Sequence, residues 1–183
     1  MDVFWKEGFA ATSLDDLSAA TGLNRPSLYG AFGDKRALYI LAYQRYRDQV
    51  QETFAPLFAA ALPLRDKLPR ILVAALDFYL SGAEGPRGCF TVLTASSDTA
   101  ADPEIRAIVR EAIEAMDRAF ERLFAAARDA GELPAEADPK RLARLTSAAV
   151  HTLSIRARAR LPRAEIEPIV EDAVMTICGP ADR

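Results

Sequence analysis

Four polar side chains that can form directional hydrogen bonds lie within six residues, at Asn24, Arg25, Ser27 and Tyr29. An arginine can donate two hydrogen bonds to a guanine, and serine and asparagine can reach base edges or phosphates. A tyrosine hydroxyl can donate to a phosphate. The pattern therefore predicts a surface that binds nucleic acid through hydrogen bonds and carries out no reaction.

Two further residues have side chains of chemical interest. Cys89, in the sequence Arg87-Gly-Cys-Phe90, is predicted at the start of a short helix, where the helix dipole and Arg87 favour reaction with electrophiles or oxidants. Cys89 is thus a candidate redox sensor, although a buried small hydrophobic residue fits the same position. His151, the single histidine, either borders a pocket or dimer interface or is an ordinary hydrogen-bonded helix residue.

Several classes of protein are disfavoured by what the sequence lacks. One histidine excludes a multi-histidine metal site within one chain, so no metal is predicted. The sequence has no glycine-rich phosphate loop, no Gly-x-Ser-x-Gly and no Cys-x-x-Cys, so we predict no enzyme and no cofactor. No apolar stretch is long enough to cross a bilayer and no secretion signal is evident, so we predict no membrane contact and a cytoplasmic location.

Charge is unevenly distributed along the 183 residues, whose net charge is −3. Residues 1–47 contain six Lys/Arg and five Asp/Glu, whereas the remainder contains 17 and 21. This asymmetry is compatible with a local nucleic-acid site at the N-terminal end, because DNA binding depends on where the positive charges lie.

Two short helices must position the polar residues around Arg25. Ser13 is a candidate cap for a helix that ends at Gly22, and Asn24 is a candidate cap for a second helix over 25–32. Leu28 and Phe32 are one turn apart and are expected to pack the second helix against the first. The result is a helix-turn-helix over residues 13–32 with an exposed polar face.

The rest of the chain is also predicted to be helical, because apolar residues recur at spacings of three and four and alternating β-branched runs are missing. The fold class is therefore all-α, an N-terminal helix-turn-helix followed by a larger helical domain. The predicted helices cover residues 34–58, 64–81, 88–97, 105–127, 139–160 and 163–178.

The segment FAATSLDDLSAATGLNRPSLYGAFGDK, residues 9–35, resembles the DNA-binding region of TetR-family repressors. The resemblance implies that residues 24–30 form the recognition helix, that Thr12 and Ser13 lie near phosphates and that Lys35 contacts the DNA backbone. Residues 1–8 resemble only the last turns of the family's first helix. The DNA-binding residues that follow from it are Thr12, Ser13, Asn24, Arg25, Pro26, Ser27, Tyr29, Gly30 and Lys35.

The resemblance implies a DNA-binding domain at 1–47 and a ligand-sensing and dimerisation domain at 48–183. The last two predicted helices are candidates for a homodimer interface, although their periodicity fits an intramolecular core equally well. Aromatic and small polar residues of the middle helices either line an apolar pocket or simply fill the core. These candidates are Phe54, Phe58, Phe78, Tyr79, Phe90, Thr91, Thr94, Met116 and Phe120, together with His151.

The expected function is that of a dimeric transcriptional regulator, a repressor released from a pseudo-palindromic operator in double-stranded DNA by a small apolar or reactive inducer. The alternative is a helical ligand-binding or interaction protein whose DNA-binding head is impaired, which the short first helix favours.

Overall fold

The structure, a computed structural model, describes residues 1–82 and 85–180, with side chains except at residues 98 and 99. Every regular element in these ranges is helical, so the predicted all-α fold class is confirmed. In chain order the elements are α1 (Asp2–Ala11), α2 (Leu14–Thr21), α3 (Arg25–Phe32), α4 (Lys35–Ala59), α5 (Leu64–Leu80), α6 (Phe90–Ala95), the 3₁₀ turn η1 (Asp98–Ala101), α7 (Pro103–Asp129), α8 (Pro139–Arg158) and α9 (Arg163–Cys178).

The head, which consists of α1, α2 and α3, is built from short helices with local caps. α1 is interrupted at Gly8, whose φ of 80° is accessible to glycine at little cost. The Asp16 N–H donates to Ser13 Oγ at 3.1 Å and the Ser13 N–H donates to the Asp16 carboxylate at 2.7 Å, which forms a capping box. Asn24 Oδ1 accepts a hydrogen bond from the Ser27 N–H at 2.9 Å. The predicted caps are therefore confirmed.

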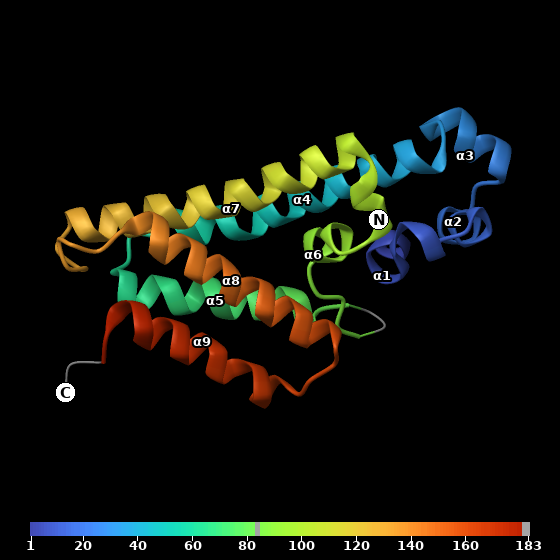
Figure 1. The fold of residues 1–183 in the computed structure, drawn as a ribbon. Coiled ribbons are helices and arrows are strands. Elements are labelled where there is room, and N and C mark those ends of the chain that lie inside the picture. The colour runs from blue at the N-terminus through green and yellow to red at the C-terminus, as the bar shows by residue number, and fades with distance from the viewer. Residues whose placement is uncertain (83–84, 181–183) are drawn as a thin grey trace.

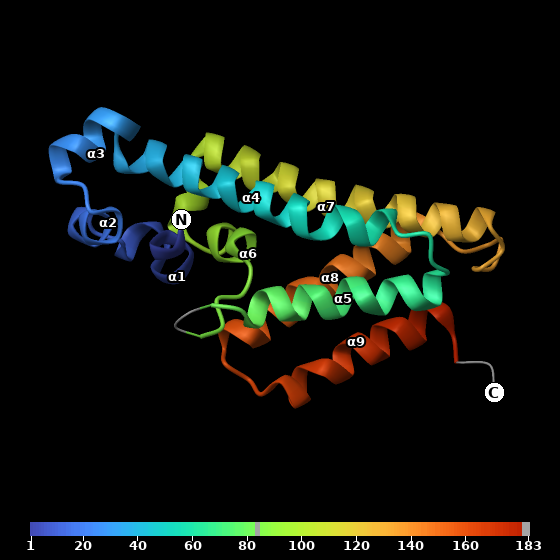
Figure 2. The same ribbon diagram turned by 180° about the vertical axis from the view of Figure 1, so that it is seen from behind.

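The body consists of α4 to α9 and η1. α4 begins in the head and lies beside α7 along one side of the molecule, whereas α9 lies on the far side of α5 and α8 (Figures 1 and 2). α7 packs on α8, α8 packs on α5, and α9 packs on both α5 and α8. α4 has 25 residues, a length of roughly 37 Å. The domain boundary predicted after residue 47 falls inside this helix, which belongs to both parts.

Trp5 connects the head to the body. Its ring is fully buried and lies 4.9 Å from the ring of Tyr46, centroid to centroid. The indole N–H donates to the Gly88 carbonyl at 3.1 Å, and the Arg87 guanidinium lies 4.0 Å from the ring centroid. The segment that precedes α6 therefore contacts α1 directly.

A second connection comes from Arg158, near the end of α8. Its guanidinium donates to the carbonyls of Trp5, Lys6 and Arg87, at 3.3, 2.9 and 3.0 Å. The first two of these carbonyls belong to α1, just before the interruption at Gly8. α8 thus reaches the head independently of α4.

The predicted helix boundaries agree with the observed ones to within two residues. α6 shows the clearest difference, because it begins at Phe90 and not at Gly88. Gly88 has a φ of 66°, and a Cβ there would lie 2.9 Å from the Ser154 carbonyl oxygen, so only glycine fits this close approach to α8. This tertiary contact, which the sequence pattern does not contain, delays the start of the helix.

Candidate DNA-recognition helix and ligand pocket

The outer face of α3 carries the polar side chains that predicted DNA recognition. Leu28 is buried against the rest of the head, whereas Tyr29 is 48% exposed. An eight-residue helix with one buried apolar residue and a polar outer face has dimensions that suit the major groove. The exposed residues of this segment are Asn24, Arg25, Pro26, Ser27, Tyr29 and Gly30.

Arg25 forms an ion pair with Asp15 within the head, which the sequence pattern did not predict. Its guanidinium donates three hydrogen bonds to the Asp15 carboxylate of α2, at 2.7 to 3.0 Å. These bonds raise the pKa of Arg25. Both side chains are more than half exposed, and exposed ion pairs contribute little free energy. The pair can therefore open and release the guanidinium to a base.

Thr12, Ser13 and Lys35 differ in accessibility. Thr12 is 1% exposed and its hydroxyl donates to the Gly8 carbonyl at 2.6 Å, so the side chain is not available for the predicted phosphate contact in this conformation. The Thr12 side chain is buried because Thr12 is the C-terminal cap residue of α1 and folds back onto the carbonyl of Gly8, where the helix is interrupted. Ser13 is exposed, although its hydroxyl takes part in the α2 cap. The Lys35 ammonium lies 4.5 Å from the centroid of the Phe9 ring.

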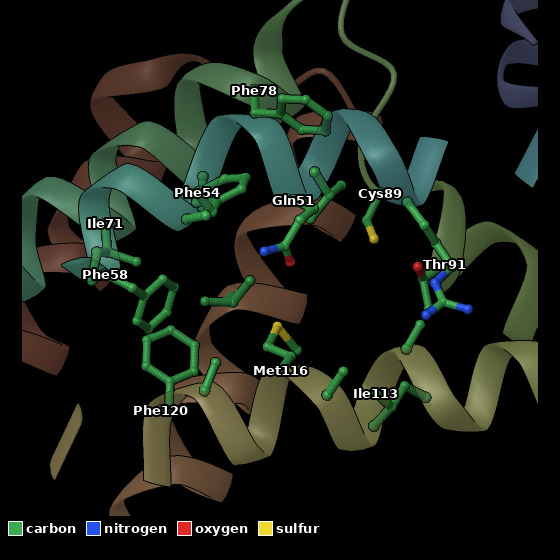
Figure 3. Close-up of a pocket in the computed structure, with 18 of the residues that line it drawn as sticks. Gln51, Phe54, Phe58, Ile71, Phe78, Cys89, Thr91, Ile113, Met116 and Phe120 are labelled. Atoms are coloured by element: carbon green, nitrogen blue, oxygen red, sulfur yellow. The ribbon is translucent and has the colours of Figure 1, made fainter. Parts of the chain in front are cut away.

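A pocket of about 910 Å³ lies in the body among α4, α5, α7 and α8, with the start of α6 at one end. Its volume falls in the range of small-molecule sites. Figure 3 shows Phe58 and Phe120 at one end and Cys89 and Thr91 at the other, with Met116 between them. The predicted residues that line it are Phe54, Phe58, Phe78, Tyr79, Thr91, Met116, Phe120 and His151, and Cys89 also lines it.

Phe90 and Thr94 do not line this pocket, which corrects two of the predicted positions. The two residues are one turn apart on α6, so they share a face, and that face points toward the head and α4. Phe90 lies 5.4 Å from the Tyr39 ring, centroid to centroid. The Thr94 hydroxyl lies 2.7 Å from the Tyr39 hydroxyl and 2.8 Å from the Phe90 carbonyl oxygen. Both side chains fill the core between the head and the body.

Cys89 lies at the polar end of the pocket beside tyrosine hydroxyls. Its Sγ is 3.2 Å from the Tyr46 hydroxyl oxygen, and its N–H donates to Ser154 Oγ at 2.8 Å. Burial raises the pKa of Tyr46 and of Tyr79 well above the ordinary value, so both phenols are neutral. A molecule in the pocket can reach the thiol, while the surrounding protein leaves it largely shielded from bulk water.

His151 lines the pocket from α8. Burial lowers the pKa of its imidazole, and the nearby Asp117 carboxylate opposes this effect more weakly. The ring is therefore neutral at pH 7 and offers one hydrogen-bond donor and one acceptor.

The predictions from sequence missed several residues that line the pocket. The polar ones include Arg47 and Gln51, which α4 places one turn apart, and the charged residues Asp48, Lys67 and Arg122. A signal for Arg47 and Gln51 was available, because Arg47, Gln51, Phe54 and Phe58 follow one another at spacings of three and four residues. The residues predicted from sequence include the aromatic members of this series, Phe54 and Phe58, and lack the polar ones. Ile71 of α5 and Ile113 of α7 were missed because nothing distinguishes them from core residues.

The described part of the chain contains no helix both long and apolar enough to cross a membrane. Within residues 1–82 and 85–180, no group of three or more His, Cys, Asp or Glu side chains is placed to hold a metal ion.

A head with an exposed recognition helix, joined by one long helix to a helical body, defines the class of helix-turn-helix transcription regulators. Residues 1–42 match the sequence profile of the bacterial regulatory proteins of the tetR family, and residues 66–170 match the tetracyclin repressor-like C-terminal domain. The chain therefore belongs to the TetR family of transcriptional regulators, which are DNA-binding proteins and not enzymes.

Known proteins of similar sequence and structure agree with this assignment. The HTH-type transcriptional repressor ComR of Escherichia coli is 27% identical over 178 residues, which cover 97% of this chain and 83% of ComR. The HTH-type transcriptional activator FasR of Mycolicibacterium smegmatis is 28% identical over 130 residues, which cover 71% and 56% of the two chains. A structure of the TetR-family regulator CifR, a cysteine mutant in complex with 26-bp operator DNA, has a TM-score of 0.87 and 29% identity, and the match covers 96% of this chain and 91% of CifR.

Proposed function

We propose that this chain is a cytoplasmic homodimeric repressor that binds a pseudo-palindromic operator and releases it when a small molecule occupies the pocket. The observation that carries the proposal is the course of α4. This one helix begins directly after the recognition helix and then lines the pocket from Gln44 to Ala59. A ligand that binds two orientations of α4 with different affinities changes the orientation of the head, which is what allosteric release requires.

The exposed face of α3 supports the DNA-binding part of the proposal. Arg25, Ser27 and Tyr29 are presented to solvent from a helix whose cap and buried Leu28 fix its orientation in the head. ComR is named as a repressor and CifR was solved with operator DNA, whereas FasR is named as an activator. Repression is therefore part of the proposal, and a reporter assay decides it.

The outer surfaces of α8 and α9 support the dimer. Leu145 and Ile155 on α8 and Met175 on α9 are large apolar side chains that are more than half exposed. Exposed apolar side chains grouped on neighbouring helices are typical of interaction surfaces. α8 contains five Lys/Arg and no Asp/Glu, whereas α9 contains one Arg and four Asp/Glu. In a two-fold dimer each α8 can face the partner's α9, which pairs opposite charges around an apolar centre.

A reactive inducer is a specific form of the proposal. An electrophile that enters the pocket meets the Cys89 thiol, and conjugate addition would form an S–C bond while the thiol proton passes to the adduct. The adduct would separate Sγ from the Tyr46 hydroxyl, 3.2 Å away, and so alter the contact between α6 and α4. If Cys89→Ser remains as sensitive as the wild type to release from DNA by N-ethylmaleimide, this form is wrong. Cys178→Ser, at the end of α9, is the matched control.

The direct test is a titration of the purified chain into duplex DNA from upstream of its own gene, over a range of salt concentrations and against a scrambled duplex. We expect the native duplex to bind at least about 1,000-fold more tightly than the scrambled duplex, which is the low end for specific recognition. Binding that is equally weak for both sequences would contradict the proposal and favour a protein whose head no longer reads DNA.

A further inference from the structure

The side chains labelled in Figure 3 are aromatic at one end of the pocket and polar at the other, and this arrangement indicates the class of ligand that the pocket takes. Figure 3 shows the aromatic rings of Phe58 and Phe120 at one end, and these rings meet edge to face at 5.3 Å between centroids. Cys89 and Thr91 lie at the opposite end, and the Gln51 amide points into the pocket between the two. A matching ligand has an apolar body and one polar head.

Four charged side chains line the pocket among the described residues: Arg47 and the exposed Asp48 on α4, Lys67 on α5 and Arg122 on α7. Of the three cations, Arg47 is the nearest in the chain to Tyr43, which contacts Thr91 at the polar end. Arg47 lies on α4 one turn after Tyr43, whose hydroxyl donates to Thr91 Oγ1 at 2.9 Å. The two residues therefore share a face of α4, which places Arg47 near the Thr91 end of the pocket. The guanidinium has donors in a planar fork and no acceptor, so its natural ligand is a carboxylate bound by two hydrogen bonds.

A carboxylate already occupies this fork in the structure. The Arg47 Nη1 and Nη2 atoms lie 3.2 and 3.3 Å from the two Glu111 carboxylate oxygens of α7. These distances are long for charge-assisted hydrogen bonds, and the side chains of Arg47 and Glu111 are 37% and 57% exposed. Such an exposed pair is weak and exchanges readily. An acid whose apolar body is buried in the pocket would bring its carboxylate to the same fork, and burial of that body would supply free energy of binding that Glu111 does not have.

We propose that the ligand is an amphipathic organic carboxylate whose apolar body packs between Phe58 and Phe120 and whose carboxylate replaces Glu111 on Arg47. The inference deepens the proposed function, because it names the chemical class of the inducer. The neutral His151 adds no competing charge, and Gln51 offers the head a further donor.

The test uses two series of probes that differ only in the head: 4-phenylbutyrate, 4-phenylbutanol and 4-phenylbutylamine, and decanoate, decanol and decylamine. Calorimetric titration of the full chain is expected to show that the acid of at least one series binds about 10-fold more tightly than its alcohol and its amine. We expect Arg47→Gln to reduce this preference to about 2-fold or less and Glu111→Gln, which removes the competitor, to strengthen acid binding by roughly 3-fold.

Two controls keep the inference falsifiable. Arg110→Gln, a matched change on the exposed face of α7, is expected to leave the preference for the acid unchanged. If Arg122→Gln removes the preference while Arg47→Gln does not, the head binds at the opposite end and the inference is wrong. It is equally wrong if no probe binds, or if an alcohol or amine binds as tightly as its acid.

Operator binding by the same variants separates this inference from the proposed function. If the acids bind through Arg47 but leave the affinity for DNA unchanged, the ligand class stands and the inducer role fails. If a neutral or cationic probe releases DNA and the acids do not bind, the regulator stands and the ligand class fails.

Discussion

At the scale of single residues, Tyr29 is the most exposed aromatic side chain of the recognition helix. Its exposure predicts that Tyr29→Ala weakens operator binding by about 10-fold through loss of a phosphate or base contact, with an unchanged melting temperature. Fluorescence anisotropy with labelled operator measures the first effect and calorimetry the second. Unchanged affinity for the operator would show that this face of α3 is not the face that meets DNA.

Arg25 changes how a similar experiment must be designed. Because Arg25 is paired with Asp15, Arg25→Ala removes both a candidate base contact and a bond between α3 and α2. Asp15→Asn weakens only the bond between α3 and α2, and it leaves the Arg25 guanidinium free to contact a base. If Arg25 reads a base, we expect Arg25→Ala to weaken operator binding by about 1–3 kcal/mol while Asp15→Asn binds at least as tightly as the wild type. Equal losses in both variants would assign Arg25 a purely structural role.

His151 predicts a dependence of stability on pH. Burial depresses the folded-state pKa of His151 below its ordinary value of 6.5, so the unfolded chain binds this proton more readily. The contribution of His151 to the free energy of unfolding is therefore constant above about pH 6.5 and falls as the pH decreases from 6.5 to the folded pKa. Urea unfolding of the wild type and of His151→Gln, above and below pH 6.5, measures the difference. If the free energy of unfolding depends on pH in the same way in the two proteins, His151 does not contribute to the pH dependence of stability.

At the scale of elements, three tyrosines of α4 connect it to α6. The hydroxyls of Tyr39, Tyr43 and Tyr46 lie 2.7, 2.9 and 3.2 Å from the side chains of Thr94, Thr91 and Cys89, respectively. Tyr39 is next to the head and Tyr46 is at the pocket. The three pairs follow one another along α4 from the pocket to Tyr39, whose ring packs on Phe4 and Phe9 of α1.

Loss of one tyrosine hydroxyl in this series is expected to destabilise the fold modestly. Tyr39→Phe and Tyr43→Phe each remove one buried hydrogen bond, so we expect each to lower the free energy of unfolding by about 0.5–1.5 kcal/mol. Tyr29→Phe removes an exposed hydroxyl and provides the control, with no measurable loss. Denaturant unfolding checks all three proteins. A wild-type value for Tyr39→Phe and Tyr43→Phe would mean that the series carries no stability.

Such contacts explain why the elements were predictable and the site only in part. The caps at Ser13 and Asn24 and the spacing of apolar residues along α7 are local signals, so the helices could be read from the sequence. The orientation of α6 depends on Gly88 meeting α8, which no local pattern contains. The predicted Thr91 and Met116 line the pocket, whereas the predicted Phe90 and Thr94 face the head and α4 because of this orientation of α6. Arg47 is not among the predicted residues, because in the sequence it resembles an ordinary surface charge.

At the scale of the whole molecule, the proposed dimer rests on the exposed apolar side chains of α8, Leu145 and Ile155. We expect the double variant Leu145→Glu/Ile155→Glu to be monomeric at micromolar concentration and to lose specific operator binding, because one recognition helix contacts too few base pairs. Leu41→Glu changes a leucine on α4 that is 46% exposed, against 54% for Leu145, and is expected to remain dimeric. Sedimentation velocity distinguishes the states. A dimer that persists in the double variant would place the interface elsewhere.

Arg158 has a consequence for how the head can move. The head is attached to the body at three places at least: through the continuous backbone of α4, through the contacts of Trp5 with Gly88 and Arg87, and through the hydrogen bonds from Arg158 to the α1 carbonyls. The head therefore cannot turn relative to the body unless at least one of these contacts changes. Because Arg158 is the last residue of α8, a shift of α8 relative to α4 must either carry α1 with it or lengthen the hydrogen bonds of this one side chain.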